Sequence, residues 1–317
     1  MDNQSSVSEF LLLKFSAIRE LQILHFIIFL IFYLTTVSGN LLIFSAVAFD
    51  HRLHTPLYFF LMNLAIQDLG SISVIIPKYL INLFTNDRHI SYSGCVTQVL
   101  LFIFFVGSDV ALLTVMAYDR YVAICNPLQY ERIMNRRACK QMALAAWFAA
   151  LLNAILHTGG TFGTPLCSNV VNQFFCEIPQ IVRLACSDLH QIEMGATVFS
   201  IVIWFDCFTF IIVSYVEIFT AVLKMPSVLG RKKAFSTCVP HLTVVSMFSL
   251  TVCLAYLKPT SSTPSSLDFI VTIMYAVFPP MLNPLIYSMR NKEIKVALSR
   301  LLSLKSSSDK SFCLCLR

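Results

Sequence analysis

The sequence predicts an all-α membrane protein, a seven-transmembrane helix bundle followed by a short amphipathic cytoplasmic helix. Only 13% of the 317 residues are charged and 57% are hydrophobic, whereas soluble domains carry about 25% charged residues. Seven apolar runs approach or exceed the roughly 20 residues that a helix needs to cross a bilayer. Because lipid offers the backbone no hydrogen bonds, these runs are expected to be helices. They cover residues 23–49, 57–84, 96–124, 142–162, 195–223, 239–257 and 269–289.

Lysine and arginine are distributed unevenly between the two sets of segments that connect these runs. One set, which includes the C-terminal tail, holds 17 of the 23 basic residues. Because cytoplasmic loops carry an excess of Lys and Arg, this set is predicted to be cytoplasmic. The chain then divides into an extracellular N-terminus (1–22), a bundle (23–289) and a cytoplasmic tail (290–317), in a multi-pass protein of the plasma membrane. The net charge of +6 follows from this topology, and no nucleic-acid partner is expected.

The two ends of the chain carry weaker signals. The first 22 residues lack the short apolar core and cleavage site of a signal peptide, so the first run is expected to insert the chain itself. Asn3 begins an Asn-Gln-Ser triplet, which matches the N-glycosylation pattern. Residues 291–304 mix apolar and basic side chains, which predicts an amphipathic helix in contact with membrane lipid.

Four cysteines fall on the predicted extracellular side, where disulfide bonds persist. Cys95 begins the third run, and Cys167, Cys176 and Cys186 lie in the connection 163–194. Four cysteines allow three pairings, and the sequence alone does not choose among them. Because this connection is longer than about 15 residues, it is expected to be functional.

Two carboxylates lie in the middle of apolar runs, Asp68 in the second and Asp109 in the third. Ionisable groups inside a membrane are costly and mark functional sites. The pair can bind a cation such as Na⁺, with Ser108 and Asn283 supplying further oxygens, or it can hold a proton within a buried polar cluster. The residues leave both interpretations open, and no other cofactor is expected.

The cytoplasmic end of the third run carries Asp119 next to Arg120. Opposite charges neutralise each other in a dry environment, and the arginine can turn to other acceptors when the bundle opens, which predicts a two-state latch. In the seventh run, Pro279, Pro280 and Pro284 each lack a backbone N–H and bend the helix near Asn283 and Tyr287. A bend beside a polar side chain suits a helix that moves, and a static kink would have the same sequence.

Taken together, these motifs resemble the rhodopsin-type G-protein-coupled receptors. The general features are Gly39-Asn40, Asp68, the string MAYDRYVAIC from Met116 and the string NPLIY from Asn283. Further strings resemble the olfactory receptor family in particular, and the resemblance runs nearly end to end. They are LHTPLYFFL from Leu53, Ser214-Tyr215, KAFSTCVPHL from Lys233 and PMLNPLIYSMRN from Pro280.

This resemblance implies a receptor of sensory-neuron cilia that binds small, mostly apolar, volatile odorants. It also implies activation of a heterotrimeric G protein of the stimulatory, olfactory type, which raises cAMP, and two disulfide bonds, Cys95–Cys176 and Cys167–Cys186. Asp109 departs from the many family members that have Glu, and the Tyr-Gly pair that often follows Phe248 is absent. The residues implied in G-protein coupling and activation are Asp119, Arg120, Tyr121, Tyr215, Asn283, Pro284 and Tyr287.

The ligand site is expected between the extracellular halves of the third, fifth, sixth and seventh runs. Its candidate residues are mostly apolar, which suits a ligand held by shape and dispersion. They are Phe102, Ile103, Val106, Gly107, Phe199, Ile203, Val252 and Tyr256.

Three other classes of protein are weaker interpretations. A rhodopsin-like receptor for a non-odorant small molecule is the nearest, because the ligand class depends on resemblance alone. A transporter or channel is supported only by Asp68 and Asp109, and the two halves of the chain show no repeat. The sequence has no phosphate loop, zinc signature or nucleophile elbow, so an enzyme is not expected.

Overall fold

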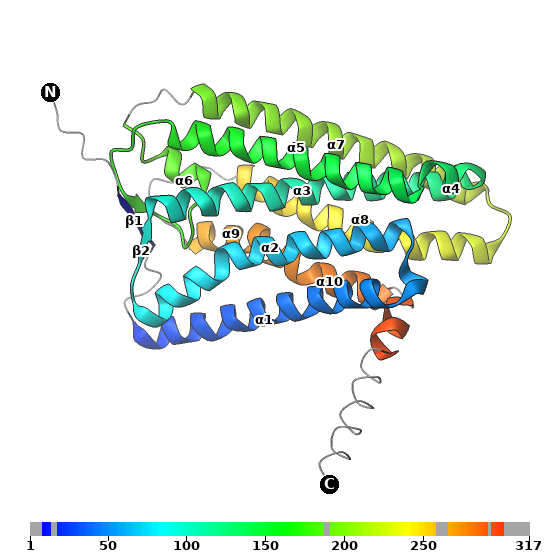
Figure 1. The fold of residues 1–317 in the computed structure, drawn as a ribbon, viewed down its shortest axis with the longest axis horizontal. Coiled ribbons are helices and arrows are strands. Elements are labelled where there is room, and N and C mark those ends of the chain that lie inside the picture. Colours follow the sequence, from blue (N-terminus) through cyan, green and yellow to red (C-terminus); the bar gives the residue numbers. More distant parts are fainter. Residues whose placement is uncertain (1–7, 14–17, 187–190, 258–265, 291–292, 301–317) are drawn as a thin grey trace, which may run out of the picture.

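The computed structural model describes residues 8–13, 18–186, 191–257, 266–290 and 293–300. Long helices make up most of these residues and run side by side along the long axis of the molecule (Figure 1). The long helices are α1 (Arg19–Phe49), α2 (Pro56–Thr85), α3 (Tyr92–Cys125), α5 (Arg136–Phe162), α7 (Gln191–Lys224), α8 (Val228–Leu257), α9 (Ser266–Ala276) and α10 (Phe278–Arg290). The short helices are α4 (Tyr130–Ile133) and α6 (Ile178–Val182), with 3₁₀ turns at His51–Leu53 and Pro127–Gln129.

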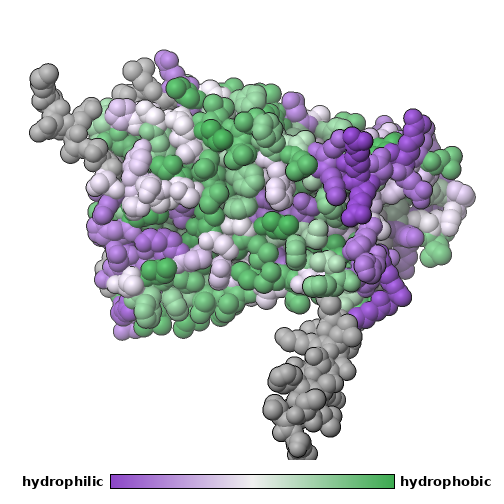
Figure 2. Space-filling view, viewed as in Figure 1, coloured by the Kyte–Doolittle hydropathy of each residue, from purple (hydrophilic) through white to green (hydrophobic). Residues whose placement is uncertain are grey.

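Six of the described helices (α1, α2, α3, α5, α7 and α8) are long and apolar enough to cross a membrane, and α9 with α10 forms a seventh span bent by 41°. The bend follows from the sequence at the junction, because Pro279 and Pro280 have no backbone N–H to continue the bonding of α9. The first turn of a new helix tolerates proline, so α10 begins there. Figure 2 shows hydrophobic residues across the middle of the molecule and hydrophilic residues gathered toward its ends. The predicted fold class is confirmed.

The two ends of the bundle differ in their secondary structure. The N-terminal face, which we define as the end nearest the N-terminus, carries three strands and α6 (Figure 1). The C-terminal face is the opposite end, where α4 and the C-terminal segment lie.

Three short strands, which the sequence analysis did not foresee, cover part of the N-terminal face. β1 (Glu9–Leu12) pairs antiparallel with β2 (His89–Ser91) and parallel with β3 (Val170–Val171), in the order β2-β1-β3. Because alternate side chains of a strand share a face, Phe10 and Leu12 both point into the protein, where they are fully buried against Cys95, Cys176 and Ile181. The N-terminal strand therefore belongs to the folded core of this face.

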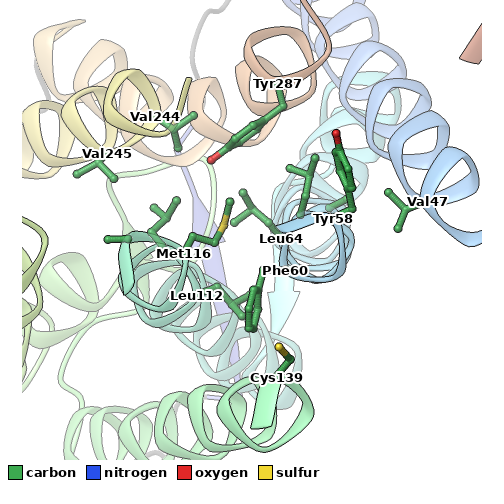
Figure 3. Packing of buried hydrophobic residues seen from close by; sticks show 14 of the residues in the cluster. Val47, Tyr58, Phe60, Leu64, Leu112, Met116, Cys139, Val244, Val245 and Tyr287 are labelled. Carbon is green, nitrogen blue, oxygen red and sulfur yellow. The ribbon is translucent and has the colours of Figure 1, made fainter. Parts of the chain in front are cut away.

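A larger apolar cluster fills the C-terminal half of the bundle (Figure 3). Leu64 of α2, Leu112 and Met116 of α3, Val244 of α8 and Tyr287 of α10 point toward one another there. Helices that are distant in the sequence thus share one core at the end where the Asp119–Arg120 motif lies.

Residues 293–300, within the predicted amphipathic segment 291–304, are helical. Ile294 and Ala297 pack into the apolar cluster of the C-terminal half. The hydroxyl group of Tyr58 donates to Oε2 of Glu293 over 2.6 Å. This helix therefore docks on the bundle through one face, and its contact with membrane lipid stays a prediction.

Replacing Phe10 by Ala is expected to destabilise the N-terminal face, because loss of a buried Phe ring costs about 3–5 kcal/mol. The melting temperature of the purified receptor should fall, and so should its level at the cell surface. Val170→Ala is the matched control, since Val170 is in the same sheet but 46% exposed. Equal effects of the two substitutions would contradict a core role for Phe10.

Candidate functional site

The N-terminal face is closed by an inserted segment, which we define as residues 173–177 of the connection between α5 and α7. A disulfide bond joins Cys176 to Cys95 of α3. The backbone N–H of Cys176 also donates to Oε1 of Gln98 over 2.8 Å, and Nε2 of Gln98 donates to the carbonyl oxygen of Val74 over 2.9 Å. The segment is therefore attached covalently to α3 and, through Gln98, to α2.

Hydrogen bonds attach the other side of the inserted segment to α9. Nε2 of Gln173 donates to Oγ1 of Thr272 over 2.7 Å, and the hydroxyl group of Tyr275 donates to Oε1 of Glu177. Loss of water around the Glu177 carboxyl group raises its pKa, and the hydrogen bond from Tyr275 opposes this effect. The segment thus spans the mouth of the bundle between α3 and α9.

Two phenylalanines in the inserted segment point into the protein. Phe174 and Phe175 are both fully buried. The ring centroid of Phe174 lies 5.3 Å from that of Phe269 in α9 and 5.8 Å from that of Phe29 in α1. Such edge-to-face pairs add to the apolar burial that holds the segment in place.

The eight predicted ligand residues do not share one surface. Phe102 is buried, and its ring centroid lies 5.3 Å from that of Phe175 and 6.4 Å from that of Tyr275. Val106 packs on the same aromatic cluster, whereas Ile103 packs on the cluster beneath the strands. Phe102 and Val106 therefore lie directly beneath the inserted segment and α9.

The other predicted ligand residues lie elsewhere. Gly107 faces α5, where an added Cβ would be 3.5 Å from the Cβ of Ala150. Phe199 and Ile203 of α7 are 53% and 42% exposed, and Val252 of α8 is partly buried. Ligand contact by these residues stays a prediction. The side chain of Tyr256 and the glycosylation candidate Asn3 lie outside the described residues.

The second predicted disulfide bond lies in the same connection. Cys167 is bonded to Cys186, with the two Cα atoms 4.8 Å apart. It closes a ring of the connection that contains the inserted segment and α6, and both of its cysteines are exposed. Of the two bonds, Cys95–Cys176 is the one that attaches the inserted segment to α3.

A polar centre links α1, α2 and α10 midway along the bundle. Nδ2 of Asn283 donates to both carboxylate oxygens of Asp68 over 3.1 Å. Nδ2 of Asn40 donates over 3.0 Å to the carbonyl oxygen of Pro280, the acceptor that Pro284 leaves without its helical N–H. A Cβ on Gly39 would lie 3.0 Å from Pro284, so glycine allows the close approach of α1 and α10. Gly39 thus leaves room for the Pro284 ring, and Asn40 satisfies the carbonyl group that the proline kink of α10 exposes.

The polar centre contains oxygens that no hydrogen bond satisfies. Asp109 is buried in α3, and its Oδ1 has no hydrogen-bond partner within the structure, nor has Oδ1 of Asn283. No group of three or more His, Cys, Asp and Glu side chains among the described residues could hold a metal ion. Two carboxylates with amide and hydroxyl oxygens are nevertheless the donors that a hard cation takes. A Na⁺ site at Asp68 and Asp109, with Ser108 and Asn283 as further oxygens, stays a prediction.

The C-terminal face contains the Asp119–Arg120 pair at the end of α3. Nε of Arg120 lies 3.8 Å from Oδ2 of Asp119, and both side chains are buried. Oδ1 of Asp119 accepts a hydrogen bond of 2.8 Å from the hydroxyl group of Tyr130 in α4. Within the described part of the chain, Nη2 of Arg120 is buried without an acceptor. Because an unpaired buried donor is costly, Arg120 gains stability from any additional acceptor brought to this face.

A second polar link at this end joins three helices. Nε2 of His241 in α8 donates to the carbonyl oxygen of Leu113 in α3 over 3.0 Å, since a carbonyl group can only accept. Its other nitrogen lies 2.9 Å from the hydroxyl group of Tyr215 in α7. Tyr215 is one of the residues predicted to act in G-protein coupling. The sequence predicted no role for His241, although the KAFSTCVPHL string contains it.

The remaining residues predicted to act in coupling surround this link. Tyr287 of α10 is buried in the apolar cluster of the C-terminal half, and its hydroxyl group has no hydrogen-bond partner in the structure. Tyr121 is partly buried against the same cluster. The structure thus brings Arg120, Tyr215 and Tyr287 to one end of the bundle.

Buried polar side chains in this bundle link helices to one another, which is the organisation of a seven-span membrane receptor. A family model described as "Olfactory receptor" matches residues 29–305. Human olfactory receptor 14A16 is 47% identical over 303 residues, which cover 95% of this chain and 98% of that protein. Human olfactory receptor 14J1 is 44% identical over 315 residues, which cover 99% and 98%. The chain belongs to the olfactory receptor family and is a multi-pass membrane receptor, not an enzyme.

Glu177→Gln is expected to remove part of the pH dependence of stability. The pKa of Glu177 in the folded protein is raised above its usual value of 4.5. This group therefore adds to the free energy of unfolding below about pH 4.5, and the addition is lost as the pH rises through the folded-state pKa. Glutamine keeps an acceptor for Tyr275 but does not titrate. The melting temperature of the variant should therefore fall less than that of the wild type as the pH is raised.

The control for this prediction is Glu9→Gln, because Glu9 is exposed on the same face and pairs only with the exposed His89. Melting temperatures are compared between about pH 4 and pH 8, where a carboxyl group with a raised pKa titrates. Identical pH profiles for wild type and Glu177→Gln would show that burial of this carboxyl group does not affect stability.

Proposed function

We propose that this receptor binds small, mostly apolar odorants in the half of the bundle beneath the inserted segment and activates a heterotrimeric G protein at the C-terminal face. The G protein is of the stimulatory type and raises cAMP. Family membership supports the odorant class. The observation that carries the proposal is the pair of contrasting ends: an apolar, aromatic region closed by residues 173–177, and a buried arginine with an unsatisfied donor at the opposite end.

Coupling between these ends requires two states with different affinities for each partner. In the resting state, Asp119 restrains Arg120. Activation moves α10 and α8 and frees Arg120 to help form the G-protein site. Pro284 and the Asn283–Asp68 hydrogen bonds provide a kinked helix with a polar contact near its middle.

Asp68 and Asp109, with oxygens of Ser108 and Asn283, hold a Na⁺ ion in the resting state of this proposal. The support is the pair of buried, unsatisfied oxygens in the polar centre. The ion supplies positive charge between two carboxylates that otherwise repel each other.

The receptor is oriented with its N-terminal face outside the cell and the basic C-terminal face in the cytoplasm of the plasma membrane. The excess of Lys and Arg at the C-terminal face supports this orientation. An epitope tag at the N-terminus should be labelled on intact cells, and one at the C-terminus only after permeabilisation. The opposite labelling pattern would reverse the proposed topology.

Cells that express this receptor should raise cAMP in response to at least one member of a broad odorant panel. Arg120→Ala should abolish this response at matched surface level, because the buried guanidinium group is needed for the G-protein site. A normal response of Arg120→Ala would overturn the role of Arg120. A panel response through a different second messenger would replace the proposed type of G protein.

Asp119→Asn is expected to raise ligand-independent cAMP. The substitution removes the charge that restrains Arg120 but keeps an oxygen for the hydrogen bond from Tyr130. A change of about 1.4 kcal/mol in the resting balance would alter the active population about tenfold. cAMP per surface receptor is the measurement, and a basal level equal to that of the wild type would contradict the latch.

A further inference from the structure

The two halves of α7 are attached to the bundle by different kinds of contact. The C-terminal half buries apolar and aromatic side chains from Ile211 to Val222. Between Ala196 and Ile211, by contrast, no side chain of α7 is buried. Val198 and Phe205, for example, are 61% and 62% exposed. The N-terminal half of α7 therefore has much less apolar burial than the C-terminal half.

A polar cluster joins this half of α7 to α5. Nδ1 of His157 in α5 lies 2.7 Å from Oε1 of Glu193 in α7, and both side chains are buried. Nε2 of His157 lies 2.8 Å from Oγ of Ser200 in α7. The hydroxyl groups of Thr161 and Thr197 donate to Oε2 and Oε1 of Glu193 over 3.2 and 3.3 Å.

Close approach of the two helices makes this cluster possible. A Cβ on Gly160 of α5 would lie 3.1 Å from both the backbone nitrogen and Oε2 of Glu193. A larger residue at this position would crowd the Glu193 carboxylate, which would have to shift away from His157 and Thr161.

Hydrogen-bond accounting shows where the protons of the cluster lie. The single O–H of Ser200 donates to Oδ1 of Asn153 over 2.8 Å, and that oxygen can only accept. Oγ of Ser200 must then accept from an N–H at Nε2 of His157. Nδ1 of His157 and Oε1 of Glu193, 2.7 Å apart, share a further hydrogen bond. Both side chains of the pair are therefore engaged at every nitrogen and oxygen.

The charged groups around this pair are few. α6 has no charged residue, and the part of α3 from 92 to 108 has only Tyr92 and the disulfide-bonded Cys95 as ionisable residues. In the same half of α2 these are Lys78 and Tyr79, and α7 carries the exposed Asp206. Within the described part of the chain, none of these groups forms a hydrogen bond or an ion pair with His157 or Glu193. Among the described residues, His157 and Glu193 therefore form an ion pair only with each other.

We propose that His157 and Glu193 form a polar clasp that holds the N-terminal half of α7 against α5. Removing either side chain leaves the other one buried without its ion-pair partner. Phe199 and Ile203, two predicted ligand residues, lie on the helical segment that the clasp fixes. His157 and Glu193 are thus positioning residues for odorant recognition, a consequence that rests on the proposed function.

Hydrogen–deuterium exchange of the purified, full-length receptor tests the clasp without an odorant or a G protein. Glu193→Gln and His157→Gln should each speed backbone exchange in residues 193–210 by about tenfold, the factor expected from losing one charge-assisted hydrogen bond. Exchange in residues 211–222 should stay unchanged and is the internal control. His89→Gln is the matched variant, because it breaks an exposed His–Glu pair on the same face and should change neither segment.

Ser200→Ala removes only the hydroxyl group that contacts Nε2 of His157, so it is the milder variant and remains informative if the other two do not fold. It should speed exchange in the same segment by a smaller factor. Unchanged exchange in residues 193–210 of all three variants, or exchange that rises equally in both halves of α7, would overturn the clasp. Failure of the odorant panel with a normal exchange result would contradict only the proposed function.

Discussion

The bundle depends on one constraint, which is that every backbone group inside the membrane must find its partner within the protein. The seventh span tests this constraint because Pro284 removes the N–H that would bond to the carbonyl group of Pro280. Asn40 replaces it from α1 with a hydrogen bond of 3.0 Å. Gly39 allows this by leaving room for the Pro284 ring. The proline at position 284 of α10 is therefore accommodated by two neighbouring residues of α1, a small one (Gly39) and a hydrogen-bond donor (Asn40).

Buried polar side chains obey a similar constraint, because they too lack water as a hydrogen-bond partner. The Asp68 carboxylate accepts two hydrogen bonds from Asn283, so the kinked helix is held at its polar centre. At the C-terminal face, one nitrogen of Arg120 and the hydroxyl group of Tyr287 are buried without partners. A buried donor or acceptor without a partner costs free energy, and a rearrangement that supplies a partner recovers it. Among the described residues, unsatisfied groups thus occur both at the polar centre, in Asp109 and Asn283, and at the face proposed to bind a G protein.

The sequence predicted the helices well because a membrane span depends on composition, which is local. The Asp119–Arg120 pair was also predictable, since the two residues are neighbours in the chain. The inserted segment was not, because Gln173 meets Thr272 across 99 residues and no periodic pattern marks that contact. The strands were missed because they have two to four residues each. Phe174 and Phe175, beside Cys176, were the signal that could have identified the inserted segment.

The position of α7 shows how one helix can serve both ends of a receptor. Its C-terminal half is fixed by apolar burial and by the Tyr215–His241 contact, which joins it to α8 and α3. Its N-terminal half is held by hydrogen bonds and an ion pair to α5, whose strength depends on geometry. Apolar contacts tolerate small shifts, whereas a charge-assisted hydrogen bond weakens steeply with distance and angle. A displacement of a fraction of an ångström therefore costs more contact energy in the N-terminal half of α7 than in its C-terminal half.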